Sequence, residues 1–148
     1  MKHIVLTGFM AVGKTAVGRR LARKLGRQFI DTDELIEARA GKTVAEVFAS
    51  EGEQAFRRLE REVVATLSPE RPAVIATGGG TFVDPDNRRR LQELGVVVCL
   101  VTSIDTVLER AGRGGKRPLA AGADRERLQR LFDERMPAYR QADVLVET

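Results

Sequence analysis

Short apolar segments recur along the chain and alternate with longer amphipathic ones. The apolar segments lie at residues 4–6, 29–30, 73–76, 96–101 and 144–146. Each is continuous rather than alternating with polar positions, which is typical of strands in a parallel sheet that helices cover on both faces. The pattern therefore predicts five buried parallel strands.

Helical spacing marks the segments between these strands. Val17, Leu21 and Leu25 recur at that spacing, and Gly26 follows them as a C-terminal cap. A further helix carries one apolar stripe, formed by Phe56, Leu59, Val63, Val64 and Leu67. A last helix is predicted over residues 125–139, with Pro137 disrupting its end and with three apolar side chains toward the core: Leu128, Leu131 and Phe132.

Capping residues indicate where several helices begin. Thr43 and Glu46 fit a capping box, Asp84 precedes Pro85 as an N-cap, and Ser103 caps the helix that follows it. Strands and helices thus alternate throughout, which predicts a three-layer α/β fold with right-handed crossovers. We expect one domain over residues 1–148.

The composition is that of an ordinary globular domain. The chain has 148 residues, 43% hydrophobic and 31% charged, and no apolar run approaches the roughly 20 residues of a membrane helix. The first strand follows Met1 so closely that we expect no leader peptide. The only cysteine, Cys99, lies in an apolar run and excludes an intramolecular disulfide. We therefore expect a cytoplasmic protein.

The net charge of +4 favours an anionic partner. The one dense basic run, at residues 88–90, has acidic residues close by. Aromatic residues make up only 5% of the chain and tryptophan is absent, so platforms for stacking nucleic-acid bases are scarce. Anionic small molecules are therefore favoured over nucleic acid, and the sequence gives no sign of a membrane partner.

A phosphate-binding motif follows the first predicted strand. Residues 8–15 read GFMAVGKT, which fits G-x-x-x-x-G-K-[ST] in full, and an amphipathic helix follows. Backbone N–H groups of such a loop, together with the helix N-terminus, bind phosphate. Lys14 can reach the β- and γ-phosphates, and the Thr15 hydroxyl can ligate Mg²⁺. The predicted ATP-binding residues here are Ala11, Val12, Gly13, Lys14, Thr15 and Ala16.

The motif identifies the nucleotide and leaves the second substrate open. GTPases, transport ATPases and metabolite kinases share it. The sequence has no N-K-x-D for reading guanine, and the chain is too short for most motor ATPases. A small-metabolite kinase that uses ATP with Mg²⁺ is the favoured class.

Two carboxylates follow the second predicted strand, where a parallel sheet binds its ligands. Asp31 suits a Mg²⁺ site reached through water, and Asp33 suits a hydrogen bond to an acceptor hydroxyl, whose proton it could accept as a catalytic base. The alternative is that Asp33 only caps the helix that follows. The residues alone leave both interpretations open.

Arg57 and the glycines at residues 78–80 are the next candidates. Arg57 lies off the apolar stripe and three residues before Glu60, so an ordinary surface ion pair is the competing interpretation. Three glycines at a strand end allow a ligand to approach bare backbone, although a flexible turn would have the same sequence.

Two further arginines suit anion binding. Arg135 continues the core-facing side of its helix, where a guanidinium needs an anionic partner unless it extends to solvent. Arg117 lies in a glycine-rich segment at residues 112–122, which we interpret as a flap that could bring a positive charge over the transferring phosphate. A solvated loop charge is the alternative for Arg117.

Taken in order, these motifs resemble the shikimate kinase family. The resemblance covers nearly the whole chain. It rests on the P-loop, on Asp31-Thr32-Asp33, on Gly52-Glu53-x-x-Phe56-Arg57-x-x-Glu60, on Gly78-Gly79-Gly80, on Arg117-Pro118-Leu119 and on Arg135-x-Pro137-x-Tyr139. The P-loop is generic, whereas the Asp-Thr-Asp, Phe-Arg-x-x-Glu, triple-glycine and Arg-Pro-Leu motifs in this order are specific to the family.

The resemblance implies phosphorylation of shikimate by ATP to shikimate 3-phosphate, a step of aromatic amino-acid biosynthesis. It implies a five-stranded parallel sheet in the order 2-3-1-4-5 and a lid near residues 112–124. The implied shikimate ligands are Asp33, Arg57, Gly79, Gly80 and Arg135. The implied phosphate and Mg²⁺ residues are Lys14, Thr15 and Asp31, with Arg117 as the catalytic lid arginine and Arg110 near adenine.

The chain departs from the family pattern at its end and in its lid. Family members continue past the last strand into a final helix, which we expect to be absent here, and the lid has Leu119-Ala120 where two leucines are common. Gluconate or a nucleoside monophosphate remains an alternative acceptor, and a regulatory nucleotide-binding domain without turnover remains an alternative function. We expect a monomer.

Overall fold

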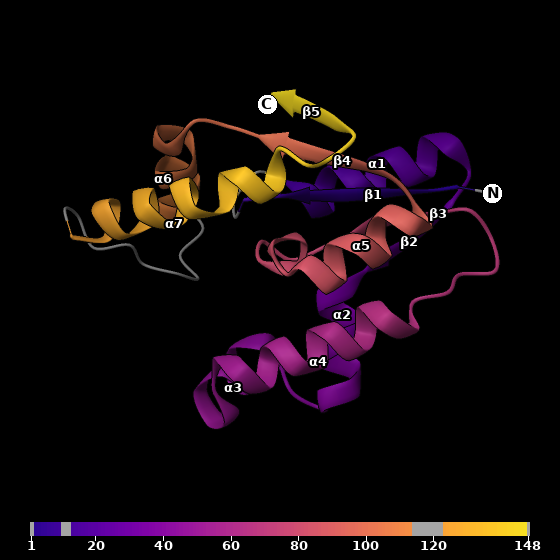
Figure 1. The fold of residues 1–148 in the computed structure, drawn as a ribbon, viewed down its shortest axis with the longest axis horizontal. Helices are drawn as coiled ribbons and strands as arrows, with labels where there is room; N and C mark the ends of the chain where they lie inside the picture. The colour runs from indigo at the N-terminus through magenta and orange to yellow at the C-terminus, as the bar shows by residue number, and fades with distance from the viewer. Residues whose placement is uncertain (1, 10–12, 114–122, 148) are drawn as a thin grey trace.

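Five parallel strands form a single sheet in the computed structural model, which describes residues 2–9, 13–113 and 123–147 (Figure 1). The strands lie in the order β2-β3-β1-β4-β5, as the family resemblance implies. Their bounds are β1 His3–Gly8, β2 Gln28–Asp31, β3 Ala73–Ala76, β4 Gly95–Val101 and β5 Val144–Glu147. The pairing register aligns Asp31 and Leu6 with Ala76, so the carboxyl ends of three strands meet at one edge.

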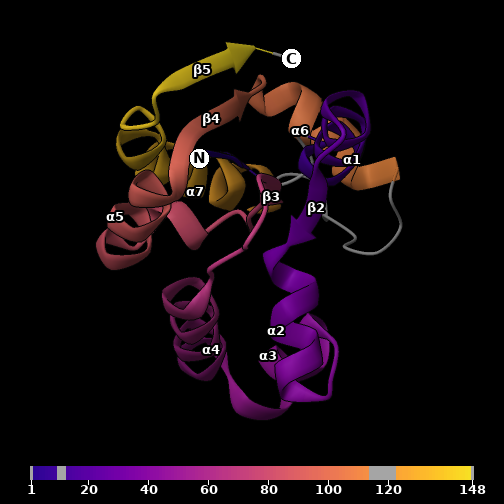
Figure 2. The same cartoon turned by 90° about the vertical axis from the view of Figure 1, so that its right-hand side faces the viewer.

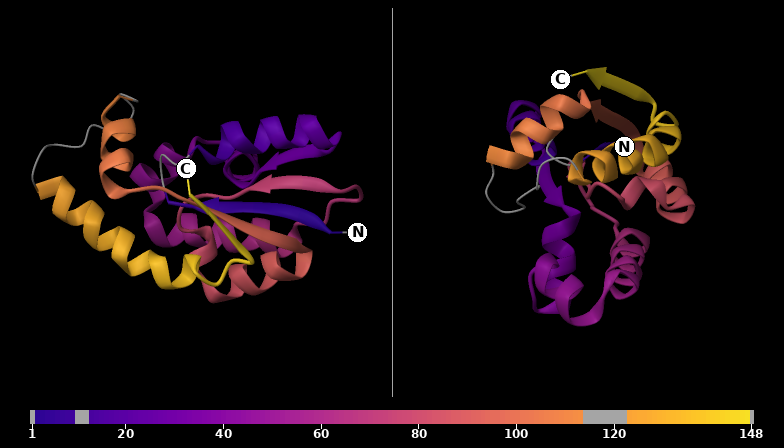
Figure 3. Two further views of the ribbon diagram at one scale, coloured as in Figure 1. Left: turned by 90° about the horizontal axis from the view of Figure 1, so that it is seen from above. Right: turned by 90° about the vertical axis from the view of Figure 1, so that its left-hand side faces the viewer.

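Helices connect the strands and cover both faces of the sheet, as predicted. They are α1 Lys14–Leu25, α2 Thr32–Ala40, α3 Val44–Glu51, α4 Glu53–Thr66, α5 Pro85–Leu94, α6 Ile104–Arg113 and α7 Ala123–Tyr139, with a 3₁₀ turn η1 at Thr81–Val83. α1 packs against one face, and α5 and α7 lie on the other (Figure 3). None of the described helices is long and apolar enough to cross a bilayer.

Helices α2, α3 and α4 form a group that projects from the sheet rather than covering a face (Figure 2). They enclose a small core of their own, made by Ile36, Val47, Phe56 and Val63. The predicted apolar stripe of α4 is confirmed by the burial of Phe56, Val63, Val64 and Leu67. Because α2 starts from the end of β2 and α4 leads back toward β3, this group forms a wall beside the carboxyl edge of the sheet.

The predicted caps are confirmed, and they fix the entry points of the helices. Thr43 and Glu46 make both hydrogen bonds of the capping box, and the Asp84 carboxylate accepts from the backbone N–H groups of Asp86 and Asn87. Ser103 Oγ accepts from the N–H of Thr106 at 3.2 Å. Gly26 ends α1 in the left-handed conformation that glycine adopts at low cost.

The helical spacing of Val17, Leu21 and Leu25 marks the buried face of α1 only in part. Leu21 packs against a core cluster, Val17 and Leu25 are exposed, and Gly18 and Ala22 are buried. A Cβ atom at Gly18 would lie 2.5 Å from Cε1 of Phe29, so any larger residue would force the Phe29 ring to move. Small residues, which the spacing of large apolar ones does not reveal, thus form much of the contact with the sheet.

Two other predictions need correction. β5 lies at the sheet edge, and Val144, Leu145 and Val146 are exposed rather than covered. Pro137 does not disrupt α7 at Met136, since the helix continues through it to Tyr139. The N–H of Arg140 still donates to the Met136 carbonyl oxygen at 3.0 Å, which keeps the last turn together despite the missing N–H of proline.

We expect the protein to lose folding stability in mild acid because of His3. Its Nδ1 accepts a hydrogen bond from the Ala73 N–H at 3.0 Å, and burial, aided by the nearby Arg27 charge, lowers its pKa below the ordinary 6.5. A histidine whose pKa falls on folding contributes stability that is present above 6.5 and lost as the pH falls below it. We expect the melting temperature to drop by a few degrees between neutral pH and about pH 5.

Thermal melts of the wild type and of His3→Gln across that range check this prediction. Glutamine can accept the same hydrogen bond but does not titrate, so its melting temperature should fall less steeply with acidification. Parallel curves for the two proteins would assign the pH dependence to other groups.

Candidate active site

The described residues at the end of β1 and the start of α1 are arranged as a phosphate-binding motif requires. Gly13 precedes α1 with a φ of 88°, a conformation that favours glycine. The Lys14 ammonium donates to the carbonyl oxygens of Gly8 and Phe9, at 2.5 and 3.2 Å. It therefore lies at the carboxyl end of β1, where it can turn from neutral carbonyls to the stronger anionic oxygens of a triphosphate. Ala16 lies in the first turn of α1.

The surroundings of Lys14 tune its charge. Burial lowers the pKa of Lys14 to about 8, and the Asp33 carboxylate opposes that effect. A lysine with this pKa remains mostly protonated at neutral pH, and a phosphate beside it would raise the pKa again. Lys14 is thus a cation facing the loop, as expected for a phosphate ligand.

Asp31 and Thr15 meet as predicted for a metal site. The Thr15 hydroxyl donates to Oδ2 of Asp31 at 3.3 Å, while Oδ1 accepts from the backbone N–H of Asp33 at 2.9 Å. Asp31 is therefore the N-cap of α2, and the alternative that Asp33 is only that cap is wrong. One hydroxyl and one carboxylate beside a phosphate loop are hard oxygen ligands of the kind that Mg²⁺ uses together with substrate phosphates.

The described residues contain no group of three or more histidine, cysteine, aspartate or glutamate side chains able to hold a metal ion.

Asp33 points into the site without a partner of its own. Its Oδ1 is buried and lacks a hydrogen bond, and it lies against the triple-glycine segment, since a Cβ atom at Gly78 would be 3.0 Å from it. Burial raises the pKa of Asp33 to about 6, and the neighbouring Asp31 adds to the rise. An unpaired carboxylate with a raised pKa suits an acceptor hydroxyl, whose hydrogen it can accept.

Arg57 is not part of an ordinary surface ion pair. Its Nη1 lies 3.1 and 3.3 Å from the two carboxylate oxygens of Glu60, whose side chain is only 1% exposed. Glu60 also accepts from the Thr81 hydroxyl at 2.8 Å. The guanidinium lies directly beside Gly80, where an added Cβ would be 2.6 Å from Nη1. Two elements, α4 and η1, thus hold the guanidinium beside the glycines.

Arg135 reaches the same place from α7. Its guanidinium carbon lies 5.6 Å from the ring centroid of Phe9, and Phe9 is itself buried against Phe132. Arg135 and Arg57 line one cavity of about 100 Å³, together with Asp33 and Gly78, Gly79 and Gly80. Arg135 therefore does not simply extend to solvent.

The cavity also has an apolar wall that the sequence did not indicate. Its apolar lining is formed by Val44, Phe48 and Phe56, and the ring centroids of Phe48 and Phe56 lie 4.6 Å apart. Phe48 is 37% exposed. The signal in the sequence that could have indicated this apolar wall is Phe48, an aromatic side chain on the outer side of its helix. Two guanidinium groups, one carboxylate, bare backbone and an apolar wall together suit a small hydroxylated ring that carries a carboxylate.

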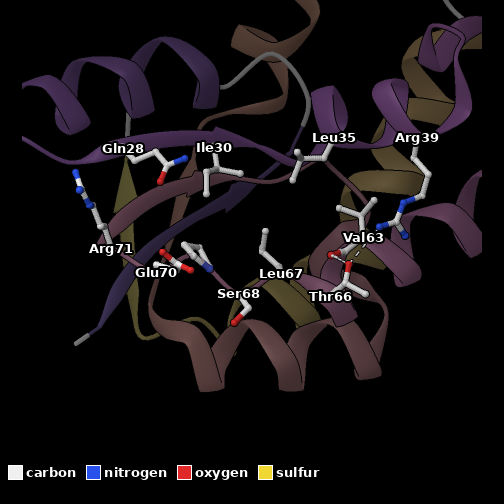
Figure 4. Close-up of a pocket in the computed structure, with 11 residues that line it drawn as sticks. Gln28, Ile30, Leu35, Arg39, Val63, Thr66, Leu67, Ser68, Glu70 and Arg71 are labelled. Atoms are coloured by element: carbon white, nitrogen blue, oxygen red, sulfur yellow. Dashed lines mark hydrogen bonds between the residues drawn. The ribbon is translucent and has the colours of Figure 1, made fainter.

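A larger hollow of about 670 Å³ lies elsewhere, beside edge strand β2 (Figure 4). Its walls include Ile30, Leu35, Val63 and Leu67, and none of the predicted site residues lines it. The larger hollow therefore does not coincide with the candidate site. Of the predicted site residues, Ala11, Val12 and Arg117 and the side chain of Arg110 fall outside the described part of the chain.

Comparison with known proteins decides the family. The family model described as "Shikimate kinase" matches residues 10–148. The chain belongs to the shikimate kinase family. A shikimate kinase of Symbiobacterium thermophilum is 50% identical over 143 residues, which cover 95% of this chain and 82% of that protein. One of Thermodesulfovibrio yellowstonii is 42% identical over 149 residues, covering all of this chain and 86% of the relative.

Solved structures agree with this family. A shikimate kinase from Acinetobacter baumannii, determined in complex with shikimate, has a TM-score of 0.91 and 40% identity, covering 100% of this chain and 84% of that one. A gluconokinase from Sinorhizobium meliloti has a TM-score of 0.59 at 16% identity, covering 99% and 81% of the two chains. At that identity the likeness concerns the fold alone.

Gly80 offers a test of whether the cavity that Arg57 and Arg135 line binds the acceptor in this shikimate kinase family member. Its φ of −97° is ordinary for any residue, but an added Cβ would displace the Arg57 guanidinium. We expect Gly80→Ala to raise the KM for the acceptor about 10-fold, equivalent to about 1.4 kcal/mol, and to leave the KM for ATP unchanged. Initial rates with each substrate varied in turn measure both constants, and an unchanged acceptor KM would contradict the prediction.

Proposed function

We propose that the protein transfers the γ-phosphate of ATP to shikimate and forms shikimate 3-phosphate. The observation that carries this proposal is the convergence of Arg57, Arg135 and Asp33 on one cavity beside the phosphate loop. Family membership supports the same reaction. So does the fold shared with a relative that was solved with shikimate bound.

In this proposal, one group of residues binds the acceptor and Lys14 binds the phosphates of ATP. Arg57 and Arg135 bind the acceptor carboxylate, and the Gly79 and Gly80 backbone lies beneath the ring. Asp33 accepts a hydrogen bond from the reacting hydroxyl, orients it toward the γ-phosphorus and can take its proton. Lys14 places a positive charge over the phosphates. Positioning and charge stabilisation, rather than a covalent intermediate, would supply the rate enhancement.

A divalent ion, proposed to be Mg²⁺, would be held by Thr15 and Asp31. When bound, such an ion neutralises charge on the β- and γ-phosphates. Arg117 as a lid arginine and Arg110 near adenine are proposed from the family resemblance alone. A cytoplasmic monomer is likewise proposed, in keeping with the buried, unpaired Cys99.

An acceptor panel tests the proposal. ADP release is measured with ATP and Mg²⁺, alone and with shikimate, gluconate or a nucleoside monophosphate. We expect release to rise at least about 100-fold with shikimate and to stay near the background with the other two acceptors. A matched Lys14→Ala protein should lose the shikimate-dependent signal.

The panel also separates the alternatives. A preference for gluconate or a nucleoside monophosphate would keep the kinase activity and overturn the acceptor. ATP binding without acceptor-dependent release would indicate a regulatory nucleotide-binding domain.

A further inference from the structure

Tyr139 lies behind the acceptor cavity without lining it. It is the only tyrosine of the chain and the last residue of α7. Its side chain is 1% exposed and packs in the main core. Its hydroxyl donates to the carbonyl oxygen of Gly79 at 2.5 Å, across 60 positions of sequence. The hydroxyl thereby joins the end of α7 to the middle of the triple-glycine segment.

Arg135 stands four residues before Tyr139 on α7, one helical turn away, and lines the same cavity as Gly79. Its interaction with the Tyr139 hydroxyl lowers the pKa of that group against the rise that burial causes. A carbonyl oxygen can only accept, so the hydroxyl gives its one hydrogen to Gly79 and keeps its lone pairs for a donor such as a guanidinium. The hydroxyl thus stands between the arginine and the glycine backbone.

We propose that Tyr139 is a positioning residue that holds the Arg135 guanidinium in register with the Gly79 backbone, so that the acceptor's carboxylate and ring are bound together. This inference rests on the proposed function. The aromatic ring is fixed by the core, and its hydroxyl orients a flexible arginine, which is how a rigid support keeps a binding side chain in one rotamer.

The hydroxyl acts through hydrogen bonds and not as a base. Burial raises the pKa of Tyr139 to about 12, so the group stays protonated over the range in which the enzyme would work. Removing it changes no charge in the site. It leaves Gly79 without this donor and frees Arg135 to adopt other rotamers.

The variant Tyr139→Phe tests the proposal because it removes only the hydroxyl. We expect the KM for shikimate to rise about 10-fold or more, as for loss of a hydrogen bond to a charged group, with the KM for ATP within about twofold of wild type. In an Arg135→Ala background the added Tyr139→Phe change should raise the shikimate KM much less, because the guanidinium through which it mainly acts is gone.

Leu128→Val is the matched control. Leu128 is a buried core residue of the same helix that does not line the cavity. We expect Leu128→Val to lower the melting temperature but not to raise the KM for shikimate relative to the KM for ATP. Melting curves of all variants, with binding of a fluorescent ADP analogue, report whether the fold and the nucleotide site are intact.

The outcomes are distinct. Tyr139→Phe could raise the KM for ATP and the KM for shikimate equally, or raise the shikimate KM as much in the Arg135→Ala background as in the wild type. Either result would mean that the tyrosine is merely structural and would overturn the proposal. An unchanged shikimate KM overturns it too. If the wild type itself shows no shikimate-dependent ADP release, the proposed function fails, and the positioning role fails with it.

Discussion

Asp33→Asn should lose turnover by about 10²- to 10⁴-fold, the range for a positioned general base, while the affinity for ATP stays near that of the wild type. The physical reason is that Asp33 presents a buried oxygen without a partner to the cavity. An amide oxygen can still accept a hydrogen bond, but it cannot take a proton at neutral pH. Initial rates and nucleotide binding measure the two effects.

The same variant should be more stable than the wild type. Folding raises the pKa of Asp33 from 3.8 to about 6. A carboxyl group with a raised pKa contributes stability that is fully present below 3.8 and is lost as the pH rises through 6. The ionised form therefore destabilises the fold at neutral pH by at most about 3 kcal/mol, less whatever solvent screens. Asparagine removes that charge.

Urea unfolding at two pH values separates this effect from ordinary mutational damage. Near pH 8, Asp33→Asn should gain about 1–3 kcal/mol in the free energy of unfolding, and the gain should vanish near pH 4. Asp31→Ala is the matched control, because loss of this N-cap should cost about 1 kcal/mol. A destabilised Asp33→Asn protein, or one with near-normal turnover, would refute the assigned role.

Arg57→Ala should raise the KM for shikimate about 100-fold, as expected when hydrogen bonds from a charged group are lost, and leave the KM for ATP nearly unchanged. It should also lower the free energy of unfolding by about 3 kcal/mol. The second effect arises because Glu60 is almost fully buried and would lose its cationic partner. Kinetics with each substrate varied, together with urea unfolding, check both results.

A second substitution separates binding from stability. In Arg57→Ala/Glu60→Gln the buried charge is absent, and the amide can still accept from Thr81, so stability should return toward the wild type while the shikimate KM stays high. Glu53→Gln is the control for the exposed partner, which lies 3.7 Å from Arg57 with 70% of its side chain exposed. It should change little. Restored shikimate binding in the double variant would contradict the carboxylate role of Arg57.

The sequence predicted the strands of the sheet and most helix starts, because these depend on local patterns. β3 is buried at all four positions, as its continuous apolar run suggests, and the capping box at Thr43 formed. β5 has the same kind of sequence but lies at the edge. An apolar run does not reveal how many neighbours a strand has, and that property belongs to the whole sheet.

The convergence of the candidate residues was predictable where residue chemistry is distinctive. Lys14, Thr15 and Asp31 meet because motif and topology bring them together, and Arg57 and Arg135 share one cavity. Burial was not predictable from spacing. Glu60 has the spacing of a surface residue three positions from Arg57, yet its side chain is buried and accepts a hydrogen bond from Thr81 of η1.

Long-range contacts of single side chains likewise could not be predicted from the sequence. The sequence marked Tyr139 only as part of a family motif, and the hydrogen bond from its hydroxyl to Gly79 depends on how α7 packs against η1. The contribution of Gly18 to the buried face of α1 was not predicted for a similar reason. Close approach through Gly18 is decided by Phe29 on a neighbouring strand, and periodicity within one helix does not report on its partner.

The most direct test of the acceptor cavity compares shikimate with its methyl ester. Both carry the reacting hydroxyl, but only shikimate offers a carboxylate to Arg57 and Arg135. We predict that kcat/KM for the ester falls at least about 100-fold with the KM for ATP unchanged. Equal kcat/KM values for the two acceptors would show that the arginines do not bind a carboxylate.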